Sequence, residues 1–319
     1  MKKSLKPQVV AVVGPTASGK TALSVYLAKL FGGEVVSADS MQIYKDMNIA
    51  TAKPSLSEMQ GIKHHLMDFL DAEEIFSVAS YVDLAHKSIS DICSRGKLPV
   101  IAGGTGLYVD NLLSGTVFSE GETDFGLREE LMKRAEEEGI DALLQEIKEY
   151  DSESYEKLRI ERNPKRIVRA IEIYKTTGVT MSRQNELSKP EEEPYEAVRI
   201  GIDFKDRQAL YNRINLRVDM MIEQGLLKEA EEFFSSHIGN TANQAIGYKE
   251  LKPYFNGEDT LENCIESLKR ATRRYAKRQL TWFRRNADTN WFYFDDYSSA
   301  EDFKSAVSDF LISKGFDLV

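Results

Sequence analysis

The sequence predicts an α/β fold: a P-loop core with a mostly parallel sheet covered by helices, plus an all-helical insertion domain. Three observations support this prediction. Residues 14 to 21 read GPTASGKT, which matches the pattern GxxxxGK[ST] and directly follows a β-branched run. Short apolar segments then alternate with helical ones, as in parallel sheets that are covered on both faces. Residues 117–196, in contrast, contain helical patterns without a strand candidate.

The strands are predicted from short apolar runs that end in glycine or polar residues. They are QVVAVVG (8–14), EVVSADS (34–40), LPVIAGGTG (98–106), AVRIGIDF (197–204) and WFYFD (291–295). Helical spacing follows the first run at 21–33 and precedes the third at 77–95, so strand, loop and helix alternate. In such a sheet, ligands bind at the carboxyl ends of the strands.

The insertion is predicted from a change in composition to Glu, Lys, Arg and Leu. Its clearest helices are LREELMKRAEEEGIDALLQEIKEY (127–150) and PKRIVRAIEIYKTTG (164–178), and the polar linker SKPEEEPYE (188–196) closes it. The predicted domains are therefore 1–116 and 197–319 for the core, with 117–196 inserted between them.

Composition limits the class of protein. With 319 residues, 42% of them hydrophobic, the chain is long enough for a packed core. No run approaches ~18 apolar residues and the N-terminus lacks a signal-type pattern, so we expect a cytoplasmic protein without membrane contact. Cys93 and Cys264 lie far apart, with no CxxC pattern, and predict neither a disulfide framework nor structural zinc.

Charge is unevenly distributed. The net charge is −9, yet residues 267–285 contain eight basic residues and no acid, so the other 300 residues sum to −17. On a helix the basic residues share one face, and Leu268, Tyr275, Trp282 and Phe283 fall on the other side, which is expected to pack in the core. Such a face is often only a solvated surface, but a stripe without acids is also typical of a track for phosphate groups of RNA or DNA. Both interpretations stay open at this point.

The P-loop predicts binding of a phosphate chain. Its backbone N–H groups and the following helix N-terminus surround phosphate oxygens, Lys20 adds a positive charge, and the Thr21 hydroxyl can bind Mg²⁺. Any diphosphate fits this arrangement. The motif alone therefore leaves open a kinase, a hydrolase, a switch GTPase, or a transferase for which diphosphate is the leaving group.

Two further side chains are expected at the same edge of the sheet. Asp39 ends the second predicted strand, where it could bind an acceptor in a kinase, act as a base in an alkyltransferase, or cap the next segment. Thr105 ends the third predicted strand with a hydroxyl that can face the ligand. His64 and His65 lie among apolar neighbours, and we assign neither a catalytic role.

Several motifs together carry a family resemblance. GPTASGKT, SADSMQIYKDMNIATAKP, VIAGGTGLYV, NPKRIVRAIEIY, QAIGYKE and AKRQLTWFRR occur in this order and spacing. Nearly the whole chain closely resembles the bacterial tRNA dimethylallyltransferases, also called tRNA isopentenyltransferases. The resemblance implies transfer of the dimethylallyl group from dimethylallyl diphosphate to N6 of adenine 37 in the anticodon loop of tRNA, with release of diphosphate.

The resemblance also implies roles for individual residues. Asp39 would accept a proton from the amine, Arg217 would stabilise the diphosphate, and Thr16 and Thr105 would order the reacting groups. The diphosphate would be bound by Gly14, Pro15, Thr16, Ala17, Ser18, Gly19, Lys20 and Thr21, with Mg²⁺ at Thr21. Contacts to tRNA would come from Asp39, Ser40, Met41, Gln42, Thr105, Arg128, Lys165, Arg166, Arg169, Gln244 and Lys249. The basic helix would add Arg273, Arg274, Lys277 and Arg278.

The expected partners are the anticodon stem-loop of tRNA and dimethylallyl diphosphate, and we expect a monomer. The alternative function is a P-loop kinase of a nucleotide or small metabolite, with the helical insertion as a lid. An RNA-binding NTP switch is a third possibility, although the sequence has no guanine-specificity element such as NKxD. Labelled dimethylallyl diphosphate and labelled ATP would distinguish these alternatives.

Overall fold

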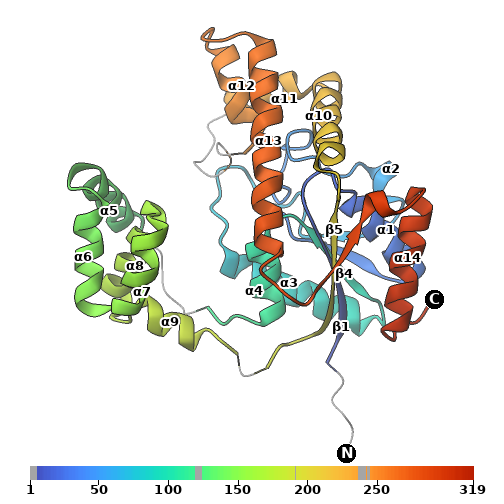
Figure 1. Ribbon diagram of the computed structural model, residues 1–319, viewed down its shortest axis with the longest axis horizontal. Helices are drawn as coiled ribbons and strands as arrows, with labels where there is room; N and C mark the ends of the chain where they lie inside the picture. Colours follow the sequence, from blue (N-terminus) through green and yellow to red (C-terminus); the bar gives the residue numbers. More distant parts are fainter. Residues whose placement is uncertain (1–5, 119–123, 191, 236–241, 243–244) are drawn as a thin grey trace, which may run out of the picture. The chain divides into compact units, whose positions relative to one another are not determined.

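The computed structural model describes residues 6–118, 124–190, 192–235, 242 and 245–319 (Figure 1). The chain forms two compact units. The core unit comprises Met1–Leu113 and Pro194–Val319, and the insertion unit comprises Ser114–Glu193. The change in composition predicts 117–196 for the insertion, three residues further along at each end.

The core unit is built on one six-stranded sheet with the order β3-β2-β4-β1-β5-β6. All registered neighbours among these strands are parallel, which confirms the predicted α/β class. The strands are β1 (Gln8–Val13), β2 (Glu34–Ser37), β3 (His64–His65), β4 (Pro99–Gly103), β5 (Glu196–Asp203) and β6 (Thr289–Tyr293).

Helices connect and cover these strands. Those of the core unit are α1 (Lys20–Leu30), α2 (Leu56–Met59), α3 (Val78–Ser94), α4 (Gly106–Ser114), α10 (Arg207–Glu223), α11 (Leu226–Ser235), α12 (Tyr248–Phe255), α13 (Leu261–Phe283) and α14 (Ala300–Ser313), with a 3₁₀ turn at Phe294–Asp296. No helix in the described part of the chain combines the length and apolar character needed to cross a membrane.

The order of the strands explains why both faces of the sheet are covered. From β1 the chain crosses through α1 to β2 in one direction, and from β3, which lies beyond β2, it crosses through α3 to β4 in the opposite direction. Because such crossovers are right-handed, the two helices lie on opposite faces of the sheet. The central strands are therefore buried on both sides, and this is why β1 is apolar from Val9 to Val13 and β4 from Val100 to Ala102.

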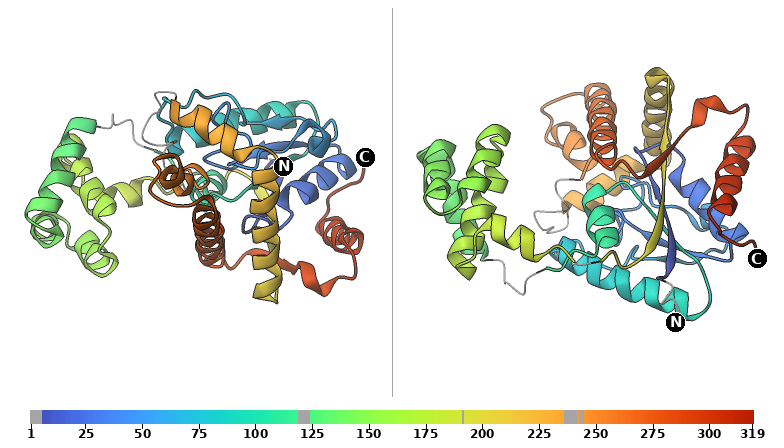
Figure 2. Two further views of the ribbon diagram at one scale, coloured as in Figure 1. Left: turned by 90° about the horizontal axis from the view of Figure 1, so that it is seen from above. Right: turned by 60° about the horizontal axis from the view of Figure 1, so that its bottom comes forward.

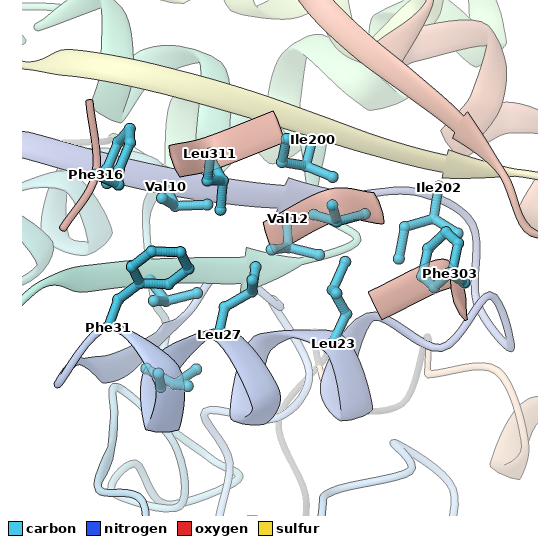
Figure 3. Close-up of a cluster of buried hydrophobic side chains, with 14 residues drawn as sticks. Val10, Val12, Leu23, Leu27, Phe31, Ile200, Ile202, Phe303, Leu311 and Phe316 are labelled. Carbon is cyan, nitrogen blue, oxygen red and sulfur yellow. The ribbon is translucent and has the colours of Figure 1, made fainter. Parts of the chain in front are cut away.

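Figure 3 shows the core beneath α1. Leu23 and Leu27 point from this helix toward Val10 and Val12 on β1, and Phe303 of α14 closes the cluster. All five side chains are at most 4% exposed. Burial of each large apolar side chain contributes about 1.5–3 kcal/mol, so this packing fixes α1, and with it the end of the P-loop, against the sheet.

A second apolar cluster holds the layer of α10 to α13 onto the segment that follows β2. Ile43, Tyr44 and Met47 of this segment pack with Val218 of α10 and Leu268 of α13. Helices α10 and α13 also pack on each other, side by side in the views of Figure 2. The segment after β2 is therefore enclosed by helices that come from the other end of the sequence.

Strand β3 was not predicted, because two residues carry no periodicity. His65 pairs with Val36 in the sheet and its Nε2 lies 2.7 Å from Glu34, which is only 3% exposed. Arg95 and Lys97 also donate to this carboxylate. The hydrogen bonds from Arg95, together with those of Lys97 and His65, hold the pKa of Glu34 far below its ordinary value despite burial. His65 thus belongs to the hydrogen-bond network of a buried carboxylate.

The insertion unit is all helical among its described residues. Its helices are α5 (Phe125–Glu137), α6 (Ile140–Tyr150), α7 (Ser152–Glu161), α8 (Pro164–Thr177) and α9 (Met181–Leu187). Leu131, Leu143, Ile147, Ile167 and Ile171 form the centre of its own apolar core. A separate core of this kind is what allows the segment to fold as a compact unit.

Candidate active site

The carboxyl ends of three neighbouring strands bring the predicted groups to one edge of the sheet. The P-loop follows β1, Asp39 follows β2 and Thr105 follows β4, and β4 lies between the other two strands. A cavity of about 1330 Å³ opens at this edge, and α10 and α13 contribute to its wall. Predicted residues that line it are Thr16, Ala17, Ser18, Gly19, Lys20, Thr21, Asp39, Ser40, Met41, Gln42, Arg217 and Arg278.

The P-loop is held by backbone features that its glycines permit. Gly14 has φ +151°, and a Cβ there would lie 2.6 Å from the carbonyl oxygen of Ile202 on β5. Gly19 has φ +96° and precedes α1 without a side-chain cap from the described residues. Gly14 and Pro15 lie in the buried base of the loop, while Thr21 is in the first turn of α1. The N–H groups of this turn are therefore directed at the cavity.

Two cations meet in this part of the cavity. Burial, and then the nearby charge of Arg217, lower the pKa of Lys20 from 10.5 to about 7, although Asp39 opposes the shift. Lys20 Nζ donates to the carbonyl oxygen of Pro15 at 2.7 Å. Burial likewise lowers the pKa of Arg217. Two desolvated cations that repel each other favour the arrival of an anion with at least two negative charges.

This charge arrangement predicts a pH dependence for diphosphate. Below pH 7 Lys20 is protonated and attracts the anion; above pH 7 binding must include uptake of a proton, because diphosphate favours the charged ammonium. We expect the affinity for inorganic diphosphate to be lost progressively above pH 7, by up to about tenfold per pH unit. Isothermal titration calorimetry at several pH values measures the affinity for inorganic diphosphate.

The variant Lys20→Ala is the control, because diphosphate itself titrates and its own contribution remains in the variant. An equal pH dependence in both proteins contradicts the expectation. The pH dependence of folding stability has the opposite sign to that of diphosphate affinity. The unfolded chain keeps the Lys20 proton up to about pH 10.5, whereas the folded chain loses it near pH 7. The contribution of Lys20 to the free energy of unfolding should therefore rise between pH 7 and 10.5.

Arg217 reaches the P-loop from α10. Its Nη1 lies 3.5 Å from Thr16 Oγ1, and its Nη2 lies 3.5 Å from the carbonyl oxygen of Ala52. One helical turn earlier, Arg213 donates through Nε to the carbonyl oxygen of Ala17 at 3.0 Å. Spacing of four residues places both guanidinium groups on the same side of α10. Arg213 was not predicted as a site residue from the sequence, although the pattern R-x-x-x-R with Arg217 could have indicated it.

Asp39 uses its two carboxylate oxygens differently. Oδ1 accepts the backbone N–H of Met41 at 2.9 Å and that of Gln42 at 3.4 Å. Oδ2 has no hydrogen-bond partner among the described residues. The capping role and the chemical role that the sequence left open are therefore compatible, because one oxygen fixes the carboxylate and the other is available to a ligand.

Thr105 is not among the residues that line the cavity and instead contacts Ser40, the neighbour of Asp39. Its Oγ1 accepts the backbone N–H of Ser40 at 3.0 Å and donates to Ser40 Oγ at 3.3 Å. The Gln42 side chain donates to the carbonyl oxygens of Thr51 and Ala52 at 3.2 and 3.1 Å. Thr105 and Gln42 thus fix the shape of the crevice that begins at Asp39.

Gln279 of α13 connects two of these loops and was missed. Its carbonyl oxygen accepts the N–H of Thr16 at 2.8 Å, and its amide donates to the carbonyl oxygen of Gly104 at 3.1 Å. It is 5% exposed, and a Cβ at Gly104 would lie 2.1 Å from its amide nitrogen. At about 100° per residue, Gln279 is opposite the basic face of its helix, so a polar residue on the apolar side was the available signal.

The apolar side of α13 is only partly as predicted. Leu268 and Phe283 are buried as expected, whereas Tyr275 lines the cavity and Trp282 donates through Nε1 to Asp110 at 2.6 Å. Mainly burial, and secondly Asp39, raise the pKa of Tyr275, so its hydroxyl stays protonated. The side of α13 opposite the basic residues therefore contributes to the site and to polar contacts as well as to the core.

The basic face of α13 is heterogeneous. Lys269 pairs with Asp219 at 2.8 Å, and Arg273 donates to the side chain of Asn215. In contrast, Arg274, Lys277 and Arg278 are exposed and have no acidic partner in the described part of the chain. Asp219 of α10 therefore neutralises Lys269, whereas Arg273 contacts only a neutral amide, and the charges of Arg274, Lys277 and Arg278 are not paired with an acid in the described part of the chain.

The predicted tRNA contacts of the insertion lie on its helices. Arg128 of α5 and Arg169 of α8 both pair with Glu172, which is fully buried, at 2.8 and 3.1 Å. Lys165 and Arg166 are exposed in the first turn of α8, and Arg166 pairs with Glu161. In the core unit, Lys249 is exposed on α12, and Gln244 lies outside the described residues.

Comparisons with known proteins agree on one family. The model of the IPP transferase family matches residues 42–286. A tRNA dimethylallyltransferase of Caldanaerobacter subterraneus subsp. tengcongensis is 45% identical over 310 residues, which are 96% of this chain and 98% of that protein. A protein with the same name from Bacillus cytotoxicus is 47% identical over 297 residues, 93% of each chain.

Solved structures give the same result. A full-length tRNA isopentenylpyrophosphate transferase from Bacillus halodurans matches with a TM-score of 0.73 and 42% identity over 97% of both chains. A eukaryotic dimethylallyltransferase acting on tRNA matches with a TM-score of 0.81 and 28% identity, over 97% of this chain and 80% of that one.

Proposed function

This chain belongs to the IPP transferase family, and on that premise we propose that it moves the dimethylallyl group of dimethylallyl diphosphate to N6 of adenine 37 in tRNA. Family membership makes prenyl transfer to tRNA the class of reaction. The observation that carries the finer proposal is the cavity in which two desolvated cations lie near a carboxylate with one free oxygen. The kinase alternative is not favoured by the comparisons.

In this proposal the P-loop binds the leaving group. As the bond between allylic C1 and the diphosphate oxygen lengthens, negative charge builds on the diphosphate while C1 becomes positive. Lys20, Arg217 and the N–H groups at the start of α1 are placed to stabilise the departing anion. The diphosphate thus keeps the electron pair of the broken bond.

Mg²⁺ is compatible with the same cavity. The Thr21 hydroxyl lines it, and magnesium commonly uses one or two protein ligands together with phosphate oxygens and water. The described residues contain no group of three or more acidic, His or Cys side chains arranged to hold a metal ion, so the proposed metal depends on the substrate for its other ligands. When bound, it would supply additional charge neutralisation to the diphosphate.

Asp39 is the proposed general base. The N6 lone pair is delocalised into the adenine ring, so the amine is a weak nucleophile until a proton leaves it. Oδ2 of Asp39 is the available acceptor, while Oδ1 is fixed by Met41 and Gln42. In the balanced step, N6 bonds to C1, the C1–O bond breaks, and the N6 proton passes to Asp39.

Adenine 37 must leave its stack to reach this cavity. Residues 39–42 line the crevice, and Thr105 and Gln42 brace it, so we propose that the splayed base is bound there. Phosphates of the anticodon stem-loop would contact the exposed part of α13 and the basic residues of α8. Affinity and base choice are thereby assigned to different surfaces.

The reaction is tested directly with purified protein, a tRNA transcript and labelled dimethylallyl diphosphate. Label is expected in tRNA that has adenine at nucleotide 37 and not in tRNA that has guanine there. Parallel incubation with ATP labelled in the γ-phosphate tests the kinase alternative. Transfer of phosphate with no prenylated tRNA contradicts the proposal.

The basic helix gives a prediction on salt dependence. In the double variant Arg274→Gln/Lys277→Gln we expect weaker tRNA binding for every anticodon-loop sequence. The slope of log K against log salt should shrink by roughly 0.7 to 0.9 for each lost phosphate contact. Filter binding at several salt concentrations measures both quantities.

Lys269→Gln is the matched control, because Lys269 is already neutralised by Asp219 and Glu266. Its slope should equal that of wild type. Discrimination between adenine and guanine at nucleotide 37 should survive in the double variant. If the double variant keeps both the affinity and the slope of wild type, this face of α13 is only a solvated surface.

We further propose a cytoplasmic monomer, since all groups of the proposed mechanism come from one chain and tRNA is the acceptor. Light scattering at working concentrations tests the oligomeric state. Fractionation of the host cell tests the location.

A further inference from the structure

A carboxylate behind the cavity wall receives three consecutive backbone donors. Glu229 of α11 accepts the N–H groups of Asn48, Ile49 and Ala50 at 2.9, 2.7 and 2.9 Å. It also accepts the hydroxyl of Tyr248 at 2.8 Å. Glu229 itself is not among the residues that line the cavity. Successive N–H groups that converge in this way form a small anion site, here filled by the protein's own side chain.

The segment held by Glu229, residues 48–52, ends at two residues of the site. The carbonyl oxygen of Ala52 accepts Gln42 Nε2 at 3.1 Å and Arg217 Nη2 at 3.5 Å. Ala52 has φ +52°, which is left-handed and unfavourable for a residue other than glycine. Such a conformation persists only where the surroundings impose it. The position of the Ala52 carbonyl thus depends on what holds the 48–52 segment.

The residue before α12 packs closely against the same segment from another direction. Gly247 has φ +117°, and a Cβ there would lie 3.0 Å from the Cβ of Ala50. Burial, and then the charge of Glu229, raise the pKa of Tyr248, so its hydroxyl remains a donor to the carboxylate. The 48–52 segment is therefore held between Glu229 and Gly247.

We propose that Glu229 is a positioning residue: through the backbone of residues 48–52 it sets the orientation of Arg217 toward the diphosphate and of Gln42 in the base crevice. The inference rests on the proposed function of Arg217 and Gln42. It assigns to α11 a part in the reaction although no residue of this helix lines the cavity. Loss of the carboxylate should allow Ala52 to leave its left-handed conformation, and the guanidinium should then lose its fixed direction.

The test is a double-mutant cycle of Glu229→Gln with Arg217→Ala. Glutamine preserves the size of the side chain but turns an NH₂ group toward backbone donors. We expect Glu229→Gln to lower single-turnover transfer about tenfold in the wild-type background, and by less than about threefold when Arg217 is already alanine. Binding of inorganic diphosphate should follow the same pattern.

If Glu229 has a purely structural role, Glu229→Gln should lower the transfer rate by the same factor in the wild-type and Arg217→Ala backgrounds. That result overturns the proposal. So does a Glu229→Gln enzyme within twofold of wild type. Tyr248→Phe is the matched control, because it removes one hydrogen bond from the same carboxylate and leaves the three backbone bonds intact. It should lower transfer by less than about threefold; a loss as large as that of Glu229→Gln shows that Glu229 acts by anchoring α12, against the proposal.

If Glu229→Gln does not fold, Gly247→Ala replaces it in the double-mutant cycle with Arg217→Ala, because the added methyl group should displace Ala50 from the side opposite Glu229. The expected and contradicting results are the same as for Glu229→Gln. Wild-type enzyme is assayed first. Its failure to prenylate tRNA contradicts the proposed function, whereas an active wild type with an additive cycle contradicts only the role of Glu229.

Discussion

Asp39→Ala is expected to lower single-turnover transfer by about 10²-fold or more while tRNA binding stays within a few-fold of wild type. The reason is that Oδ2 is the acceptor for the N6 proton, whereas affinity for tRNA depends on basic residues elsewhere. Rapid-quench measurement with excess enzyme isolates the chemical step, and filter binding gives the affinity.

Asp39→Asn separates the chemical role of Asp39 from its capping role. Asparagine keeps an oxygen for the N–H groups of Met41 and Gln42, but it is not a base. The proposed mechanism requires Asn and Ala to be similarly slow. If Asn transfers at the wild-type rate, Asp39 is only a cap and the proton leaves by another route.

Lys20→Ala and Arg217→Ala are each expected to reduce transfer by about 10²- to 10³-fold, the usual effect of removing one group that stabilises a developing anion. Both cations face the departing diphosphate, and both are desolvated, which strengthens their interaction with it. Single-turnover rates at saturating dimethylallyl diphosphate measure this effect. ATP should be neither consumed nor required.

Lys205→Ala is the matched control, because Lys205 is exposed and pairs with Asp296. It should transfer at the wild-type rate. ATP turnover in proportion to product would instead indicate kinase chemistry, and undiminished transfer in Lys20→Ala would remove the P-loop cation from the mechanism.

The parallel core was predictable because its information is local. Buried strands on both faces need continuous apolar runs, so β1, β2, β4 and β5 could be read from short windows. The bounds shifted at β6, predicted at 291–295 and found at 289–293, since apolar content does not show where hydrogen bonding to a neighbour begins. Strand β3 exists only through its pairing with β2.

The residues of the candidate site also divide into those that a local sequence pattern identifies and those that it does not. Lys20, Thr21 and Asp39 are recognisable because their roles follow from position in a motif or at the end of a strand. Arg217 needed the family resemblance, and Gln279 and Glu229 were not assigned any role. Their hydrogen bonds join residues that are 263 and about 180 positions apart, and no local pattern encodes such a pair.

By itself, then, the sequence determined the α/β class, the phosphate-binding loop and the carboxylate beside it, because short-range periodicity and backbone conformation specify these features. Only the tertiary structure decided which oxygen of Asp39 is free, which charges of α13 are neutralised by α10, and that Gln279 and Glu229 hold the loops of the cavity. These properties depend on helices that pack on the sheet from distant parts of the chain, and burial and hydrogen-bond geometry arise only once that packing is complete.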